Sequence, residues 1–250
     1  MSRKSLWIAA LLLAALGLPA AQADKAAGRA RVKDFAFEFQ PSPVGDLKIP
    51  AMKVSVLPMI NENDVSRHTR NLEKAFRNMR PEEYPQVLGF RFNANGKPLN
   101  RFMTGETFEV ILKAALEQEL EALGLELVPA PIAEPPADFR RKTLQQLAES
   151  YPEAKPDVLI GCKIEDFFFS TRPGPFKLKM ETFFILDVVA YSLAEDDFVW
   201  EGTVEAGELE KKAMIMGREA VDNRLDASFK ELIEGVVRNN SELLVELTKL

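Results

Sequence analysis

The sequence predicts a single α/β domain: a mixed sheet with two β-α-β crossovers, a three-stranded antiparallel meander and a C-terminal helix. Three observations lead to this class. Strand-like apolar runs alternate with helical patterns over the first two thirds of the chain. Three strand-like runs joined by short turns follow, and roughly the last 30 residues have helical spacing.

Residues 1–23 have the three parts of an export signal. Arg3 and Lys4 come first, the apolar run 6–18 follows, and 21-AQA-23 is a small-residue cleavage site. The run is shorter than the roughly 20 residues that span a membrane. We therefore expect cleavage, secretion through the inner membrane into the periplasm, and no transmembrane span in the mature chain. A retained N-terminal anchor is the alternative.

Composition limits the partners and the chemistry. Removing residues 1–23 lowers the 32 basic residues by two, so that 30 basic face 38 acidic residues with a formal net charge of −8. This balance argues against nucleic acid or a bare anionic membrane as the main partner. The single cysteine, Cys162, cannot form an internal disulfide, and its apolar surroundings predict a buried thiol.

The first half of the mature chain begins with a loosely ordered lead-in over 24–50, which contains a possible short edge strand at 35–39. The α/β domain extends over 51–250. Its first strand is 53–60, which is β-branched and apolar. Apolar alternation over 84–100 follows, with the turn-forming pair 95-NG-96.

A helix is predicted over 105–124, because apolar residues recur there at three- and four-residue spacings. Its glutamates are interpreted as a solvated face. A strand at 125–128 follows Gly124, and four prolines make 129–138 a linker or loop. A shorter helix is expected over 139–150.

The meander is predicted from the runs 157–172, 176–193 and 198–208, which short turns connect. In the first run, strand alternation places Phe167 and Phe169 on one face and Phe168 on the other. All three are core residues if helices cover both faces of the sheet. A contact role near the turn is the alternative.

No motif specifies a reaction. The chain has one histidine, His68, which excludes a two-histidine zinc site, and it lacks a phosphate-binding glycine loop and a G-x-S-x-G elbow. The acidic run 195-EDD-197 is interpreted as a polar turn and not as an all-carboxylate metal site. We predict no catalytic residues, no metal and no cofactor; an enzyme acting on an envelope polymer is the alternative.

Several runs resemble the YajG-type bacterial envelope lipoproteins: 88-LGFRFNANGKPLNRF-102, 158-VLIGCKIEDFFF-169, 186-LDVVAYSL-193 and 198-FVWEGTVEAG-207. The layout is also similar to that of the auxiliary lipoproteins of lipid-export systems. The resemblance implies a noncatalytic cell-envelope component and supplies no catalytic residues. Those families carry a lipid-modified cysteine after the signal, whereas this chain has Asp24 there.

Two binding hypotheses follow. The first is an envelope accessory protein that binds another envelope protein through the loop containing Phe90, Phe92, Asn95 and Arg101. The second is a periplasmic protein that binds a lipid or another apolar ligand, through residues at the turn or between sheet and helix: Phe167, Phe169, Arg172, Phe176 and Trp200. The identity of the partner and the oligomeric state stay open.

Overall fold

The structure is a computed structural model that describes residues 31–34, 51–64, 81–152, 155–174 and 177–213, together with 227, 230 and 231. The predicted signal, most of the lead-in and nearly all of the predicted C-terminal helix lie outside these residues. Met1–Ala30 is a unit of its own, and the fold below is that of Arg31–Leu250. Within the described ranges, no helix is long and apolar enough to cross a membrane.

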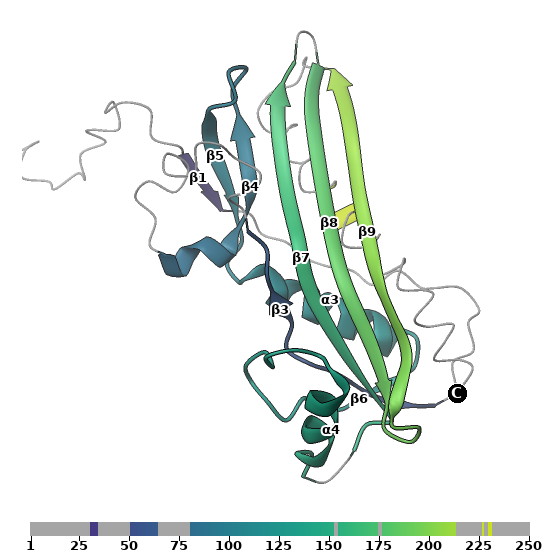
Figure 1. Cartoon of the computed structure of the whole chain (residues 1–250). Helices are drawn as coiled ribbons and strands as arrows, with labels where there is room; N and C mark the ends of the chain where they lie inside the picture. The colour runs from purple at the N-terminus through teal and green to yellow at the C-terminus, as the bar shows by residue number, and fades with distance from the viewer. Residues whose placement is uncertain are drawn as a thin grey trace, which may run out of the picture. The chain divides into compact units, whose positions relative to one another are not determined.

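One mixed sheet of nine strands organises the described part of the chain and confirms the predicted α/β class (Figure 1). In the described ranges up to residue 213, two α-helices and a short 3-10 helix accompany it. The strands are β1 (Arg31–Asp34), β2 (Lys53–Val56), β3 (Ile60–Asn61), β4 (Val87–Phe92), β5 (Pro98–Met103), β6 (Glu126–Leu127), β7 (Val158–Pro173), β8 (Lys177–Ser192) and β9 (Asp197–Ala213). The helices are η2 (Pro81–Gln86), α3 (Phe108–Ala122) and α4 (Arg141–Glu149).

The long strand β7 holds the sheet together. On one side it pairs antiparallel with β8 from Val158 to Pro173, and β8 pairs in the same way with β9, which confirms the meander. On its other side three short strands pair with β7 in succession, all of them parallel: β2 at 158–160, β3 at 163–164 and β4 at 169–171. Further strands extend this side, β6 beside β2, and β5 and β1 beside β4.

The connections explain this order. α4 joins β6 to β7, which lie parallel on the two sides of β2, and so forms a parallel crossover. α3 joins β5, which is antiparallel to β4, to β6 at the far end of β7. β1, within the predicted lead-in, pairs parallel with β5, whereas the strand expected at 35–39 lies outside the described residues.

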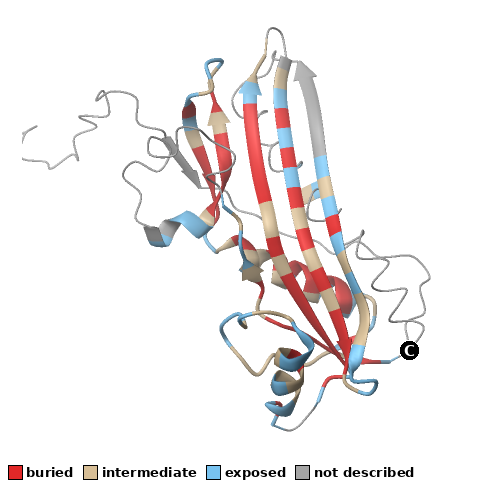
Figure 2. Cartoon of the chain, in the orientation of Figure 1, coloured by how far each residue is buried: buried red, intermediate tan, exposed pale blue. Residues whose placement is uncertain are grey.

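The face of the sheet toward α3 contains the larger core (Figure 2). Strict alternation would place Ile164 opposite Phe167 and Phe169, but the β7–β8 register shifts between Ile164 and Asp166. This bulge brings Ile164 into the same buried cluster as Phe167 and Phe169. The ring of Phe108 on α3 stacks on Phe167 with centroids 4.2 Å apart.

The opposite face is also buried, at both ends of β7. Near one end, Phe168 packs in a cluster with Phe90 and Phe92. Near the other end, Leu144 of α4 packs in a cluster with Tyr191 of β8. All three consecutive phenylalanines are therefore core residues, as the two-sided covering requires.

Between β3 and β4, a side chain replaces a strand. The Asn63 Nδ2 donates to the carbonyl oxygen of Phe167 at 3.0 Å, and the Phe167 amide donates to Asn63 Oδ1 at 3.1 Å. One asparagine amide thus satisfies both backbone groups of Phe167, as a paired residue of a neighbouring strand would. The backbone hydrogen bonding along this edge of β7 therefore continues between β3 and β4.

The turn between β8 and β9 is bound to α4 by one carboxylate. Asp196, which has a φ of 53°, accepts hydrogen bonds from the Tyr191 hydroxyl, from Arg141 at 3.1 Å and from Gln145 at 2.8 Å. Aspartate tolerates this left-handed backbone better than most residues. The hydrogen bond from Tyr191, followed by those from Gln145 and Arg141, lowers the pKa of Asp196 to about 2.

Gly89 tests the pairing of β4 with β7. A Cβ at this position would lie 1.8 Å from the carbonyl oxygen of Phe169, and that oxygen belongs to rigid strand backbone. We expect Gly89→Ala to separate the two strands and to lower the thermal unfolding temperature by several degrees. Gly105→Ala is the matched control, because nothing lies within 4 Å of the added methyl group. Equal unfolding temperatures for the two variants would contradict the close approach of β4 to β7.

The lowered pKa of Asp196 predicts that part of the stability of the folded protein is lost in acid. Its folded-state pKa of about 2 is below the ordinary value of 3.8, so its contribution is present above about pH 4 and is lost as the pH falls toward 2. Asp196→Asn keeps the side-chain size. We expect this variant to have a lower free energy of unfolding at neutral pH and to lose less of it than the wild type as the pH falls from about 4 to 2. Urea unfolding at a series of pH values measures both. Glu195→Gln, an exposed neighbour, should leave the pH dependence unchanged, and an unchanged dependence in Asp196→Asn would contradict the assignment.

Candidate functional site

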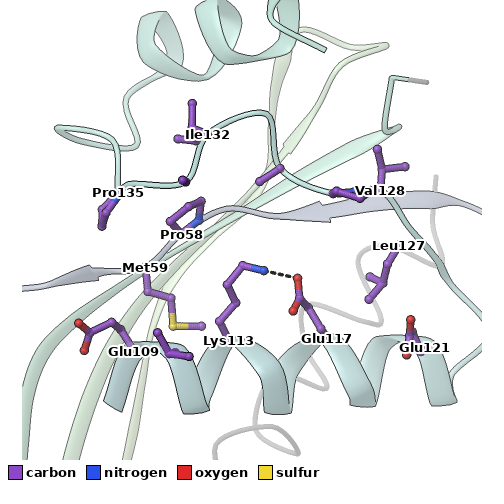
Figure 3. A pocket seen from close by; sticks show the side chains of 14 residues that line it. Pro58, Met59, Glu109, Lys113, Glu117, Glu121, Leu127, Val128, Ile132 and Pro135 are labelled. Atoms are coloured by element: carbon purple, nitrogen blue, oxygen red, sulfur yellow. Dashed lines mark hydrogen bonds and ion pairs between the residues drawn. The ribbon is translucent and has the colours of Figure 1, made fainter. Parts of the chain in front are cut away.

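A groove of about 640 Å³ runs along the outer face of α3 (Figure 3). The helix forms one side. The other side is formed by the chain between β2 and β3 and by the segment that leaves β6. Its apolar lining is contributed by all three parts: Pro58, Met59, Val110, Leu127, Val128 and Ile132.

The helix contributes a row of charged side chains because of its period. Glu109, Lys113, Glu117 and Glu121 are four residues apart and therefore lie one above another on one face of α3. The neighbouring stripe of α3, which includes Leu112 and Leu116, is buried in the core. The buried stripe thus fixes which charges face the groove.

Val110 is an exposed apolar residue of α3 beside this row of charged side chains. It is 49% exposed, one of the few large apolar side chains at the described surface, and it lines the groove. Exposed apolar residues are common singly, but one inside a concave surface beside other apolar groups offers a contact.

The opposite wall is held at both ends. At its start the Val128 amide donates to the carbonyl oxygen of Val54 at 2.8 Å, which continues the pairing of β6 with β2. At its end Asp138 accepts hydrogen bonds from the Thr143 hydroxyl at 2.6 Å and from the Arg140 amide at 3.1 Å. The prolines between these points restrict the backbone. The wall is therefore anchored, although the chain there has no regular secondary structure.

The groove carries excess negative charge. Three carboxylates, Glu109, Glu117 and Glu121, face one ammonium group, that of Lys113, so the lining has a net charge of −2. Lys113 pairs with Glu117, and Glu109 accepts a hydrogen bond from Asn61 Nδ2 at 2.9 Å. The structure gives Glu121 no side-chain partner among the described residues. Apolar and anionic lining together suit a ligand that has apolar groups and a positive charge.

The residues predicted to bind a partner are mostly inside the protein. Phe90 and Phe92 of β4 are buried in one cluster, and Arg101 of β5, paired with Phe90, is 5% exposed. Asn95 is exposed at the hairpin turn, where its amide donates to Asn93 Oδ1 at 3.0 Å. No contact in the structure tests a binding role for these residues, which stays a prediction.

The residues predicted to bind a ligand are not gathered in one place. Phe167 and Phe169 are buried side by side, whereas Trp200 is half-buried on β9 opposite Ala190. Trp200 pairs with Ala190 and Phe167 pairs with Phe184, so the two aromatic residues are six positions of β8 apart, or about 20 Å along the strands. Arg172 is exposed, with its guanidinium 4.7 Å from the ring centroid of Phe92. Phe176 lies outside the described residues.

Sequence reasoning did not find the groove, because its glutamates were interpreted as a solvated helix face and 129–138 as a linker. The four-residue spacing of charges with an apolar Val110 among them was the available signal. What the sequence did not show is that the proline-rich segment lies opposite this face. Among the described residues there is no cluster of three or more His, Cys, Asp or Glu side chains placed to hold a metal ion.

Comparison with known proteins gives only distant likenesses. No family model and no curated protein matches the chain. A Xanthomonas campestris protein of the DUF330 family has a similar structure, with 8% identity, a TM-score of 0.49, and coverage of 86% of this chain and 95% of that one. A hypothetical protein of Chlamydia trachomatis has 8% identity and a TM-score of 0.43, with 80% and 100% covered.

A third likeness is to the lipoprotein GNA1162 of Neisseria meningitidis, with 13% identity, a TM-score of 0.32, and coverage of 74% of this chain and 98% of that one. At these values none of the three assigns the chain to a family or a function. The resemblance to YajG-type lipoproteins therefore stays a prediction.

Cys162 lies on β7 in the core and is fully buried, as the sequence predicted. Burial raises the pKa of its thiol to about 12. Because the thiolate is the reactive form, this thiol is protected both by its pKa and by its lack of access.

We expect the native protein not to react with a thiol-specific colorimetric reagent at neutral pH over an hour, and to react with one equivalent after unfolding in guanidinium. A surface cysteine introduced by Gln146→Cys, on the exposed side of α4, provides the positive control. Rapid labelling of Cys162 in the folded protein would contradict its place in the core.

Proposed function

We propose that this chain is a noncatalytic accessory protein of the cell envelope, exported to the periplasm, which binds another envelope protein along the α3 groove. The groove itself is the observation that carries the proposal. It is an anchored concave surface with an exposed apolar residue, Val110, and charged groups along one side. Such a mixture is typical of surfaces that recognise a specific partner.

The export signal predicted at residues 1–23 supports the location, because a chain with such a segment is directed across the inner membrane. The net charge of the mature chain supports a protein partner over nucleic acid. The envelope role implied by the YajG-type resemblance agrees with both points.

An apolar ligand or lipid is the second reading of the sequence, and the described contacts support it less. Two of the aromatic residues that suggested it, Phe167 and Phe169, pack against other core rings: the ring centroids of Phe102 and Phe169 are 5.1 Å apart, and those of Phe167 and Phe184 are 6.2 Å apart. None of these four residues lines the groove. A lipid tail prefers a more enclosed and less charged cavity than one bordered by four charged side chains.

The test is crosslinking inside living cells. A photo-crosslinking amino acid in place of Val110 should attach to one envelope protein, which mass spectrometry then identifies. The same amino acid in place of Gln146, exposed on α4 and outside the groove, should not attach to it. Purified partner and mature chain should then form a complex in vitro, and Val110→Lys should weaken it. Equal crosslinking from both positions, or attachment to lipid alone, would overturn the proposal.

A further inference from the structure

We infer that the partner presents to the groove an extended segment of about six residues, in which basic side chains alternate with apolar ones. This inference rests on the proposed function and specifies the partner's chemistry. Three properties of the described groove lead to it: its length, its charge, and its supply of hydrogen-bonding groups.

The length of the groove sets the number of partner residues that it can hold. Glu109 and Glu121 both line the groove and are twelve helical positions apart, a distance of about 18 Å at 1.5 Å per residue. An extended chain advances about 3.3 Å per residue, so that five or six residues fill the groove.

The charges of the groove favour basic side chains in the partner. They favour binding of these side chains at the C-terminal end of the charged row on α3. Lys113 is occupied by Glu117, and Glu109 is held by Asn61, whereas Glu121 at the C-terminal end of the row is exposed. A lysine or arginine of the partner has its best position between Glu117 and Glu121. An acidic segment would meet the net charge of −2 without compensation.

The far wall favours a donor-rich ligand. Pro129 and Pro135 line the groove and have no backbone N–H, so the backbone of this wall has fewer donors than acceptors. Carboxylates on the helix side are also acceptors. An acceptor-rich groove suits basic side chains and a backbone whose N–H groups are free, as they are in an extended chain and not in a helix.

The apolar lining provides the contacts for the alternate side chains. Met59 and Leu127 lie between the helix and the wall, and Ile132 belongs to the wall itself (Figure 3). Val110 lines the groove from the helix and is half exposed. In an extended segment, successive side chains point in opposite directions. Apolar groups can therefore face this lining while basic groups reach the carboxylates.

The test uses the mature full chain and fluorescein-labelled hexapeptides in which leucine or valine alternates with lysine. Matched peptides carry glutamate or glutamine in place of lysine. Fluorescence anisotropy should show the lysine peptide binding at least tenfold more tightly than the glutamate peptide. Its affinity should fall as salt rises, because the groove charges are accessible to solvent.

Variants then locate the binding. Glu117→Lys/Glu121→Lys should abolish the preference for the lysine peptide and transfer it to the glutamate peptide, which loss of folding could not produce. Glu149→Lys/Glu195→Lys makes the same charge change outside the groove, at exposed positions on α4 and in the β8–β9 turn, and should keep the preference. Val110→Lys should weaken the lysine peptide about fivefold or more, by charge repulsion and lost contact.

The outcomes separate the two proposals. Equal binding of all three peptides, or a preference unaffected by the groove variants, overturns this inference. If no peptide binds while Val110 still crosslinks to one identified envelope protein, the groove is a protein-binding surface and the inferred segment is wrong. If the crosslink at Val110 fails as well, the proposed function fails with it.

Discussion

The described fold depends on the enclosure of most of β7. Its side chains are buried against α3 on one face and in the clusters of Phe168 and Leu144 near the two ends of the other face, and its backbone is paired along both edges. A strand in this position has no freedom to shift by one residue, because any slip would exchange its two sets of buried side chains. The positions of β2, β3, β4 and β8 follow from it, and so does the side of the sheet on which α3 lies.

That enclosure also determines what α3 can offer to a partner. The helix buries one stripe in the core, so the remaining positions, four residues apart from Glu109 to Glu121, must face outward. The proline-rich segment opposite them is fixed by β6 at one end and by Asp138 at the other. The groove is therefore a product of core packing, although none of its charged groups contributes much to the core.

Local patterns predicted the local structure well. The span of α3, the turn at Asn95 and Gly96, and the meander were readable because each depends on neighbours in the chain. The bulge after Ile164, the pairing of Asn63 with Phe167 and the opposition of the proline-rich segment to α3 depend on contacts between distant residues, which periodicity does not encode. Phe90 and Phe92 illustrate the same difference: their sequence suggested an exposed loop, and the sheet places them in a core cluster. The binding residues proposed from the sequence and those lining the groove therefore do not overlap.

The asparagine that lies between β3 and β4 also limits association of the sheet with other chains. An unpaired N–H and C=O on a strand edge can pair with the strand of another molecule. Because Asn63 satisfies both backbone groups of Phe167, this stretch of β7 offers no such site. A short polar side chain thus gives β7 the protection against edge-to-edge aggregation that a neighbouring strand gives it elsewhere.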